Sequence, residues 1–170
     1  MKNRNRQIIV GAVILLTVLC LAFIFANSLK DSAASSEQSS AVKEFLMKIA
    51  RFFGFRGDIN VSKLRNFAHV AEFALLGGCL GALAVYLARR KEKVSLVRYL
   101  LFAFAAVGAG ILCAVVDELL QLTSEGRVCD IGDVVLDTVG IFSGVLLGSL
   151  AYFLFVKIIN LRKKRQKDKI

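Results

Sequence analysis

The sequence predicts an all-α integral membrane protein, a four-helix bundle in a single domain covering residues 1–170. Of its residues 56% are hydrophobic, and the mean hydropathy is +0.64. The apolar residues form four nearly uncharged blocks instead of the stripes or alternation of soluble domains. Each block has about the 20 residues that an α-helix needs to cross roughly 30 Å of hydrocarbon, whereas barrel strands alternate. The predicted membrane helices span about residues 8–26, 67–88, 99–122 and 134–156.

The first apolar block follows Lys2, Arg4 and Arg6, which is also typical of a signal peptide. Its apolar run is longer than the hydrophobic region of most signal peptides. The sequence Ala26-Asn27-Ser28 is only a loose match to a cleavage site. We therefore expect a retained membrane helix.

Lysine and arginine collect in three places: the N-terminus, the connection before the third helix, and a basic tail over residues 160–170. The connection before the fourth helix instead carries five carboxylates and one arginine, Arg127. The positive-inside rule therefore places both termini and the second connection in the cytoplasm, and the first and third connections on the opposite side of the membrane. The net charge of +10 is explained by these flanks. We expect membrane lipids as partners and no nucleic acid.

The first connection is long and has two parts. Its polar start, "NSLKDSAASSEQSS", is expected to be flexible at least in part. An amphipathic helix is predicted over about residues 41–53, with Ser39 or Ser40 as its N-cap. Beside a membrane, such a helix lies in the interface with its phenylalanines at the acyl boundary. The alternative is a cover packed on the ends of the membrane helices, and both interpretations place it over the extracytoplasmic face.

Small residues recur at helical spacing in two of the predicted membrane helices. Gly140, Gly144 and Gly148 repeat every four residues in the last helix, and Gly77 and Gly81 do so in the second. Faces of small residues let helix backbones approach closely in lipid. The sequence therefore predicts close packing along these faces.

Polar residues from three helices fall at the predicted outer end of the bundle. Asp137 lies on the same face of the last predicted helix as Gly140 and Gly144. Because that face is predicted to pack closely against another helix, Asp137 should face the bundle interior. A charge about one turn inside the membrane costs roughly 2.5–3.5 kcal/mol, so such residues persist when they are paired, face water or do chemistry. The predicted ligand-binding residues are Arg65, His69, Glu72, Asp117, Glu118, Gln121, Arg127, Asp133 and Asp137.

Three interpretations of this cluster compete. In the first, a polar network ties the helix ends together, with Arg65 or Arg127 neutralising carboxylates. In the second, the cluster binds or transforms an amphiphile near the lipid headgroups, and the candidates for acid–base catalysis are His69, Glu72, Asp117 and Glu118. Whether the protein is an enzyme stays open. The third is a metal site drawn from His69, Glu72, Asp117, Glu118 and Asp133, but these spacings are weak signals, and we expect no metal or other cofactor.

Two segments carry a resemblance to a known family: "LRNFAHVAEFALLG" (residues 64–77) and "DELLQLTSEGRVCDIGDVVLDTVG" (residues 117–140), with "SSEQSS" after the first helix. They resemble the VanZ-like family of bacterial membrane proteins, which shows an H-x-x-E-Y-like motif, then D-E-x-x-Q, G-R and an aspartate that opens the last helix. The matching positions are His69, Glu72, Asp117, Glu118, Gln121, Gly126, Arg127, Asp133, Gly140 and Gly144. Departures are Asn66 where a basic residue is common, Phe73 where tyrosine is usual, and Asp137 where asparagine is commoner.

The resemblance implies a role in the cell envelope, since the founding member of the family is associated with low-level resistance to the lipoglycopeptide teicoplanin. We expect an extracytoplasmic polar site that engages an amphiphilic or lipid-linked envelope ligand and contributes to glycopeptide resistance. The alternative is a non-catalytic structural or interaction protein whose polar residues only tie the bundle together.

Overall fold

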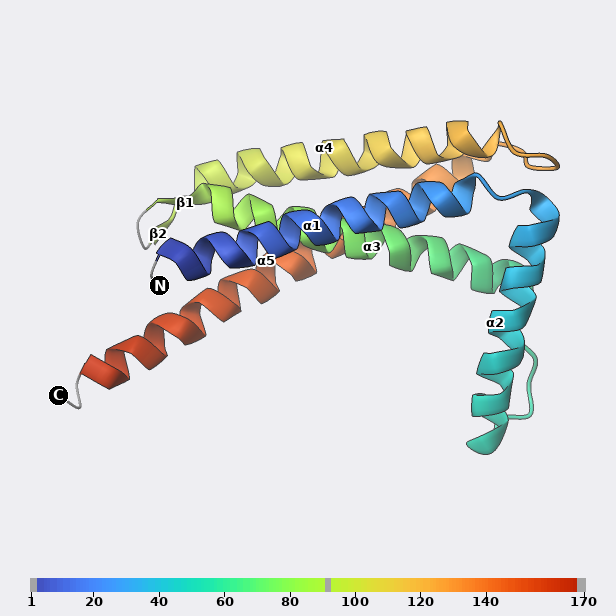
Figure 1. The fold of residues 1–170 in the computed structure, drawn as a ribbon, viewed down its shortest axis with the longest axis horizontal. Helices are drawn as coiled ribbons and strands as arrows, with labels where there is room; N and C mark the ends of the chain where they lie inside the picture. Colours follow the sequence, from blue (N-terminus) through green and yellow to red (C-terminus); the bar gives the residue numbers. More distant parts are fainter. Residues whose placement is uncertain (1–2, 91–92, 168–170) are drawn as a thin grey trace.

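The computed structural model describes residues 3–90 and 93–167 as five helices and two very short strands (Figure 1). In chain order the elements are α1 (Asn3–Ser28), α2 (Ser32–Phe52), α3 (Val61–Ala88), β1 (Arg89–Arg90), β2 (Lys93–Val94), α4 (Leu96–Gln121) and α5 (Ile131–Lys167). The strands β1 and β2 pair antiparallel at the turn between α3 and α4. The predicted all-α architecture is confirmed.

Four of the helices are long and apolar enough to cross a membrane, as predicted. These segments are Gln7–Ser28, Val61–Ala88, Leu96–Gln121 and Ile131–Ile159. Helix α5 continues to Lys167, so the part of the predicted basic tail up to that residue is helical, and residues 168–170 lie outside the described part of the chain. Helix α3 begins at Val61, directly after Asn60, whose side chain accepts a hydrogen bond from the backbone N–H of Lys63 at 3.2 Å.

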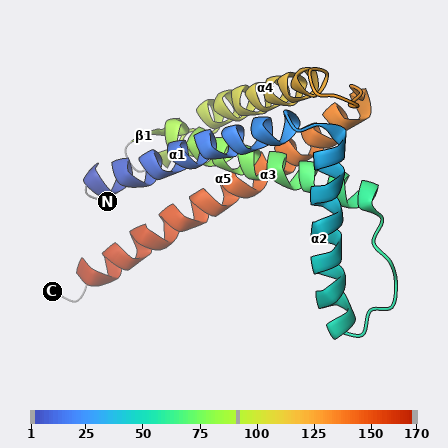
Figure 2. The same ribbon diagram turned by 45° about the vertical axis from the view of Figure 1, so that its right-hand side comes forward.

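The connections divide between the two ends of the bundle. The described chain ends and the β1–β2 turn lie at one end, and the α1–α2 and α4–α5 connections lie at the other (Figures 1 and 2). The distribution of lysine and arginine predicted the same arrangement, with the first and third connections on one side of the membrane. The polar residues that follow α1 and α4 are thereby brought to one end of the molecule.

Helix α2 differs from its prediction in length and start. It begins at Ser32 instead of about residue 41, and its N-cap is Asp31, which accepts a hydrogen bond from the backbone N–H of Ala34 at 2.7 Å. The polar stretch expected to be flexible is therefore helical from Ser32 onward. Two contacts explain the difference: the Ser32 N–H donates to the carbonyl of Glu125 (3.1 Å), and the Ser39 hydroxyl is satisfied within the helix by the carbonyl of Ser35 (2.9 Å).

Helix α2 lies across the end of the bundle and extends past its side (Figures 1 and 2). Met47 is buried, whereas Phe52 is 84% exposed and Phe53 is 80% exposed. An ion pair of 2.8 Å between Lys43 and Asp58 ties the helix to the chain that follows it, and the hydrogen bond from Lys43 lowers the pKa of Asp58. Most of the apolar face of α2 therefore has no protein partner within residues 3–90 and 93–167.

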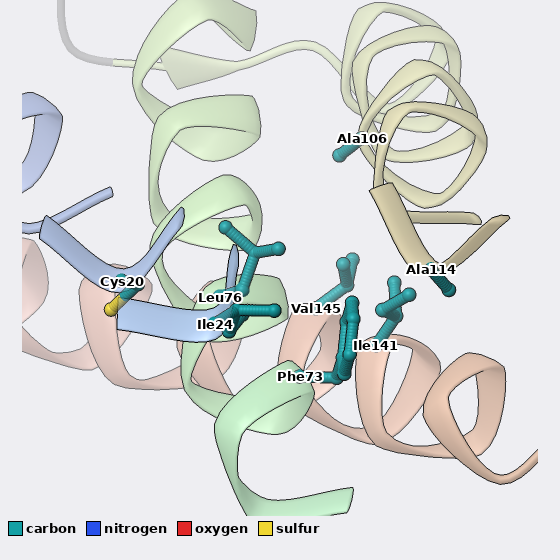
Figure 3. Packing of buried hydrophobic residues seen from close by; sticks show 8 residues of the cluster. All are labelled: Cys20, Ile24, Phe73, Leu76, Ala106, Ala114, Ile141 and Val145. Carbon is teal, nitrogen blue, oxygen red and sulfur yellow. The ribbon is translucent and has the colours of Figure 1, made fainter. Parts of the chain in front are cut away.

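The core contains small and branched side chains, and the ring of Phe73, from all four membrane helices. Figure 3 shows Ile24, Leu76, Phe73, Ile141 and Val145 gathered between the helices, with Cys20 and Ala106 at the margins. The buried members of the cluster are Cys20, Ile24, Phe73, Leu76, Ala106, Ala114, Ile141 and Val145. The core thus fixes the positions of the four helices just inside the end that carries the polar residues.

Helices α3 and α5 cross backbone to backbone. A β-carbon placed on Gly144 would lie 2.1 Å from the carbonyl oxygen of Ala74, and one placed on Gly77 would lie 2.4 Å from that of Ile141. These separations are far below van der Waals contact, so only glycine fits there. The predicted close-packing faces are confirmed, and this crossing packs Gly140 of α5 against Val70 of α3, next to Asp137 and His69.

Candidate functional site

The two carboxylate side chains at the end of α4 are buried inside the bundle. Asp117 is 0% exposed and Glu118 is 2% exposed, and Gln121 one turn later is buried as well. Asp137 on α5 is 1% exposed, which confirms the prediction that it faces the bundle interior. Buried carboxylates in a membrane protein are costly unless they are paired, hydrogen-bonded or bound to a cation. Their surroundings therefore indicate what the site does.

Asp117 is held by hydrogen bonds to both of its carboxylate oxygens. The hydroxyl of Ser28, at the end of α1, donates to Oδ1. The side-chain amide of Gln121 donates to Oδ2 at 3.1 Å. The hydroxyl of Ser124 donates to the carbonyl of Ser28 at 3.0 Å, which joins the α4–α5 connection to the end of α1. Asp117 is thus oriented by α1 and by its own helix.

A second chain of hydrogen bonds links α1, α2 and α3 through Glu72. The Asn27 side-chain amide donates to Glu72 Oε1 at 3.3 Å. The Lys30 ammonium in turn donates to Asn27 Oδ1 at 2.8 Å and to Gln38 Oε1 at 2.7 Å. The sequence did not identify Asn27, Ser28, Lys30 or Gln38 as site residues, because single polar residues in or after the end of an apolar helix carry no distinctive signal.

Glu118 has a different surrounding from its neighbour Asp117. Its Oε2 accepts a hydrogen bond from the backbone N–H of Asp130 at 3.0 Å, within the α4–α5 connection. The same connection turns at Gly126, which has a φ of +72° that favours glycine. Glu118 thereby positions the loop that carries Arg127.

Three ligand-type side chains converge from three helices. One nitrogen of His69 and one carboxylate oxygen each of Asp117 and Asp137 all lie within 4.8 Å of one another. Both oxygens of Asp137 are buried without a hydrogen-bond partner. This trio, called here the His-Asp-Asp cluster, differs from the set of possible metal ligands weighed in the sequence: Asp137 belongs to it, and Glu72, Glu118 and Asp133 do not.

A pocket of about 100 Å³ lies beside this cluster, between α2, α3 and the α4–α5 connection. Its charged and polar wall includes Arg65, His69, Glu72 and Arg127. Burial and the nearby charge of Arg65 lower the pKa of the Arg127 guanidinium, which nevertheless stays protonated. The full lining is Asn27, Ser35, Gln38, Ser39, Val42, Leu64, Arg65, Ala68, His69, Glu72 and Arg127.

The arginines of this pocket do not neutralise the buried carboxylates directly. In the part of the chain that the structure describes, the ion pairs are Lys43–Asp58 and Lys48–Glu44, both involving α2. Neither Arg65 nor Arg127 lies within 4.0 Å of a carboxylate oxygen, so the ion pairs that the first interpretation expected are not formed. The two guanidinium groups are available to an anionic group in the pocket.

The predicted ligand-binding residues thus divide into separate groups. Arg65, His69, Glu72 and Arg127 line the pocket, and Asp117 and Asp137 join His69 in the cluster beside it. Gln121 supports Asp117, and Glu118 supports the α4–α5 connection. Asp133 is half-buried in the first turn of α5 and lies in neither group.

The comparisons with known proteins agree with the resemblance carried by these motifs. The family model VanZ/LLP1 matches residues 13–155, which covers most of the chain and all of the polar residues described above from Asn27 onward. Neither a curated protein nor a solved structure matches the chain. The chain belongs to the VanZ/LLP1 family and is a multi-pass membrane protein with four membrane helices.

Proposed function

We propose that this VanZ-like protein binds the polar headgroup of an amphiphilic or lipid-linked envelope ligand in the pocket between α2 and α3. One observation carries the proposal: Arg65 and Arg127 line one pocket and neither is paired with a carboxylate. Arginine guanidinium groups bind carboxylate and phosphate oxygens through paired hydrogen bonds. The ligand headgroup is therefore anionic, as are phosphates and carboxylates of envelope lipids and lipid-tailed antibiotics.

The orientation proposed for the chain puts this pocket on the extracytoplasmic side of a bacterial cytoplasmic membrane. The argument is the positive-inside rule applied to the basic N-terminus, the basic α3–α4 connection and the basic end of α5. The pocket lies at the opposite end of the bundle, together with the α1–α2 and α4–α5 connections (Figure 1). An envelope ligand would thus reach it from outside the cell.

Helix α2 supports a ligand that approaches from the membrane. A helix that crosses the end of a membrane bundle and exposes Phe45, Phe52 and Phe53 fits the interface between headgroups and acyl chains. Because Ser35, Ser39 and Val42 of the same helix line the pocket, the pocket would lie at headgroup depth. A lipid-linked molecule could then place its headgroup there without leaving the bilayer.

This proposal connects the site to the antibiotic association of the family. Teicoplanin is a lipoglycopeptide, so it has the lipid tail that an amphiphilic ligand of this site would carry. A protein that holds such a molecule at the membrane surface would change how much antibiotic reaches its target. We propose a contribution to glycopeptide resistance by this route.

The experiment compares Arg65→Ala and Arg127→Ala with Arg56→Ala, an exposed arginine outside the pocket. Binding of teicoplanin and of phosphate-bearing lipids to the purified protein would be measured, together with teicoplanin susceptibility of cells. Loss of a charged hydrogen bond is worth about 1.5–3 kcal/mol, so each pocket variant should bind about 10-fold to 150-fold more weakly. Arg56→Ala should behave as the unmodified protein.

In the alternative, the protein has a non-catalytic structural or interaction role. The hydrogen bonds from Ser28 to Asp117 and from Asp130 to Glu118, which join separate parts of the bundle, support it. It makes the opposite prediction for the same variants. If Arg65→Ala and Arg127→Ala fold normally and retain full binding and the full cellular phenotype, the pocket proposal is wrong.

A further inference from the structure

We propose that His69, Asp117 and Asp137 bind one divalent first-row transition-metal cation of the zinc or manganese type. The inference deepens the proposed function, because the cation would lie beside the headgroup pocket, with His69 belonging to both. Its binding can be tested without any organic ligand. The argument rests on geometry, on uncompensated charge, and on the support given to the carboxylates.

The geometry of the three donor atoms suits a shared cation. They lie within 4.8 Å of one another and come from α3, α4 and α5. Zinc binds nitrogen and carboxylate oxygen at roughly 2.0–2.2 Å, so two ligand atoms on one ion are at most about 4.4 Å apart. Small side-chain rotations would bring the three atoms onto one ion.

Asp137 provides an independent observation that points to a ligand. It is 1% exposed, both of its oxygens lack a hydrogen-bond partner, and one of them belongs to the cluster. Buried carboxylates are normally hydrogen-bonded, and one with neither oxygen satisfied needs a partner of another kind. A cation between Asp137 and Asp117 is such a partner.

The charge balance also favours a divalent cation. Asp117 and Asp137 bring two carboxyl groups into the bundle, and neither lies within 4.0 Å of a lysine or arginine nitrogen among the described residues. One divalent ion would neutralise both carboxylates. It would also remove the repulsion between them, which a monovalent partner would do only in part.

The hydrogen bonds around Asp117 resemble the outer support of a metal ligand. Ser28 holds one carboxylate oxygen and Gln121 holds the other, so the carboxylate plane is fixed while lone pairs stay free for a cation. Residues in this position orient ligands and raise metal affinity without touching the metal. Ser28 and Gln121 are thus positioning residues in this proposal.

The donor set selects the class of metal. Imidazole nitrogen favours zinc and other later transition metals, whereas carboxylate oxygens also suit manganese. Three protein ligands leave at least one coordination position open, as in sites where a metal contacts a further molecule. Because His69 also lines the pocket with Arg65 and Arg127, an anionic oxygen of the headgroup would complete the coordination.

The test measures metal binding to the purified full chain, isolated in detergent through a tag without histidine. Metal would be removed with a chelator, and Zn²⁺ or Mn²⁺ would be added back alone. Elemental analysis after desalting should show about one ion per chain, and the added metal should raise the melting temperature. Absence of stoichiometric metal for both ions would overturn the proposal.

Variants assign the site to its residues. Asp137→Asn keeps the shape of the side chain and removes the buried carboxyl group, so it should fold and lose stoichiometric metal. His69→Gln should do the same, and Ser28→Ala should bind about 10-fold to 100-fold more weakly. Asp130→Asn, an exposed carboxylate on the same end of the molecule, should bind as the unmodified protein does. Equal metal binding by Asp137→Asn would exclude this cluster.

The experiments can contradict either proposal without contradicting the other. Arg65→Ala and Arg127→Ala should keep the metal and lose the anionic ligand, because the arginines lie outside the His-Asp-Asp cluster. Metal loss in Asp137→Asn with normal binding by the arginine variants would contradict the proposed function alone. Weakened ligand binding by the arginine variants in a chain that never holds metal would contradict only the metal site.

Discussion

Asp117 and Glu118 are neighbours in the chain, yet their carboxylates have different partners. Adjacent residues on an α-helix point about 100° apart, so the two side chains leave α4 in different directions. Asp117 contacts Ser28 and lies within reach of His69 and Asp137, whereas Glu118 accepts the backbone N–H of Asp130. One carboxylate therefore belongs to the candidate site, and the other holds the connection that delivers Arg127 to it.

The Ser28→Ala substitution tests how much Asp117 depends on its donor. Removing the hydroxyl leaves a fully buried carboxylate oxygen without its hydrogen bond, so the free energy of unfolding should fall by about 1–3 kcal/mol. Denaturation of the purified protein in detergent with chelator present would measure this. Ser95→Ala is the matched control, because Ser95 precedes α4 but makes no capping hydrogen bond with its side chain. An equal, small effect of both substitutions would show that the Ser28 bond contributes nothing to stability.

Among the elements, the crossing of α3 and α5 decides how close the site residues come. Gly140, Gly144 and Gly148 of α5 face backbone atoms of α3, and a β-carbon at Gly148 would lie 2.0 Å from the carbonyl oxygen of Gly78. Without a hydrophobic driving force in lipid, such close packing is what holds membrane helices together. The crossing also sets the separation between His69 on α3 and Asp137 on α5, so packing and site geometry are coupled.

Gly144→Ala should weaken this crossing. Its new β-carbon would meet the backbone of Ala74 at 2.1 Å, which is relieved only if the helices move apart, so we expect a loss of about 1–3 kcal/mol or more. Gly108→Ala on α4 is the control, because no atom beyond the nearby backbone of α4 itself lies within 4 Å of its added β-carbon. That change should leave stability unchanged or raise it by up to about 1 kcal/mol through helix propensity. Thermal unfolding of both variants in one detergent would decide, and equal melting temperatures would contradict the close-packing argument.

At the scale of the whole molecule, the two ends of the bundle carry different chemistry. The basic end holds the described chain ends and the α3–α4 connection, and the other end holds α2, the pocket and the acidic α4–α5 connection (Figure 2). A bilayer distinguishes these ends, because cytoplasmic loops retain lysine and arginine. In the proposed orientation, the basic end would lie in the cytoplasm and the pocket on the opposite side of the membrane.

Labelling of Cys129 tests the orientation. Cys129 is exposed in the α4–α5 connection, whereas the other three cysteines lie within membrane helices. An impermeant thiol reagent should label it in intact cells, or in spheroplasts where there is an outer membrane, and Cys129→Ser should abolish the signal. Labelling only after permeabilisation would mean that the orientation is inverted.

The pH dependence of that labelling follows from the surroundings of the thiol. Local desolvation and the carboxylates of Glu118, Asp130 and Asp133 raise the pKa of Cys129. The thiolate is the reactive form, so less of it is present at neutral pH than for an unperturbed cysteine. The labelling rate should therefore be low near neutral pH and rise as the pH increases toward the raised pKa. A rate that does not change with pH would contradict this.

The sequence by itself determined the membrane class, the four helices, the grouping of connections by charge, the glycine faces and the inward direction of Asp137. Each of these follows from properties local to one helix, because lipid imposes length, apolarity and internal backbone hydrogen bonds on every span separately. The family motifs also lie within single segments, so they were readable without a structure. The start of α2 was not, because the N–H of Ser32 is bound by the distant Glu125 carbonyl, whereas its end at Phe52 agrees with the prediction.

Only the tertiary structure decided which polar residues meet. Ser28 and Asp117 are 89 positions apart, and Asn27 and Glu72 are 45 apart, so no spacing in the chain indicates either contact. The choice of Asp137 over Glu72 and Asp133 as the partner of His69 and Asp117 depends on the depth and rotation at which α3, α4 and α5 cross. The depth and rotation of each helix are set by packing between helices, at Gly144 and its neighbours. They cannot be predicted from the periodicity of a single helix.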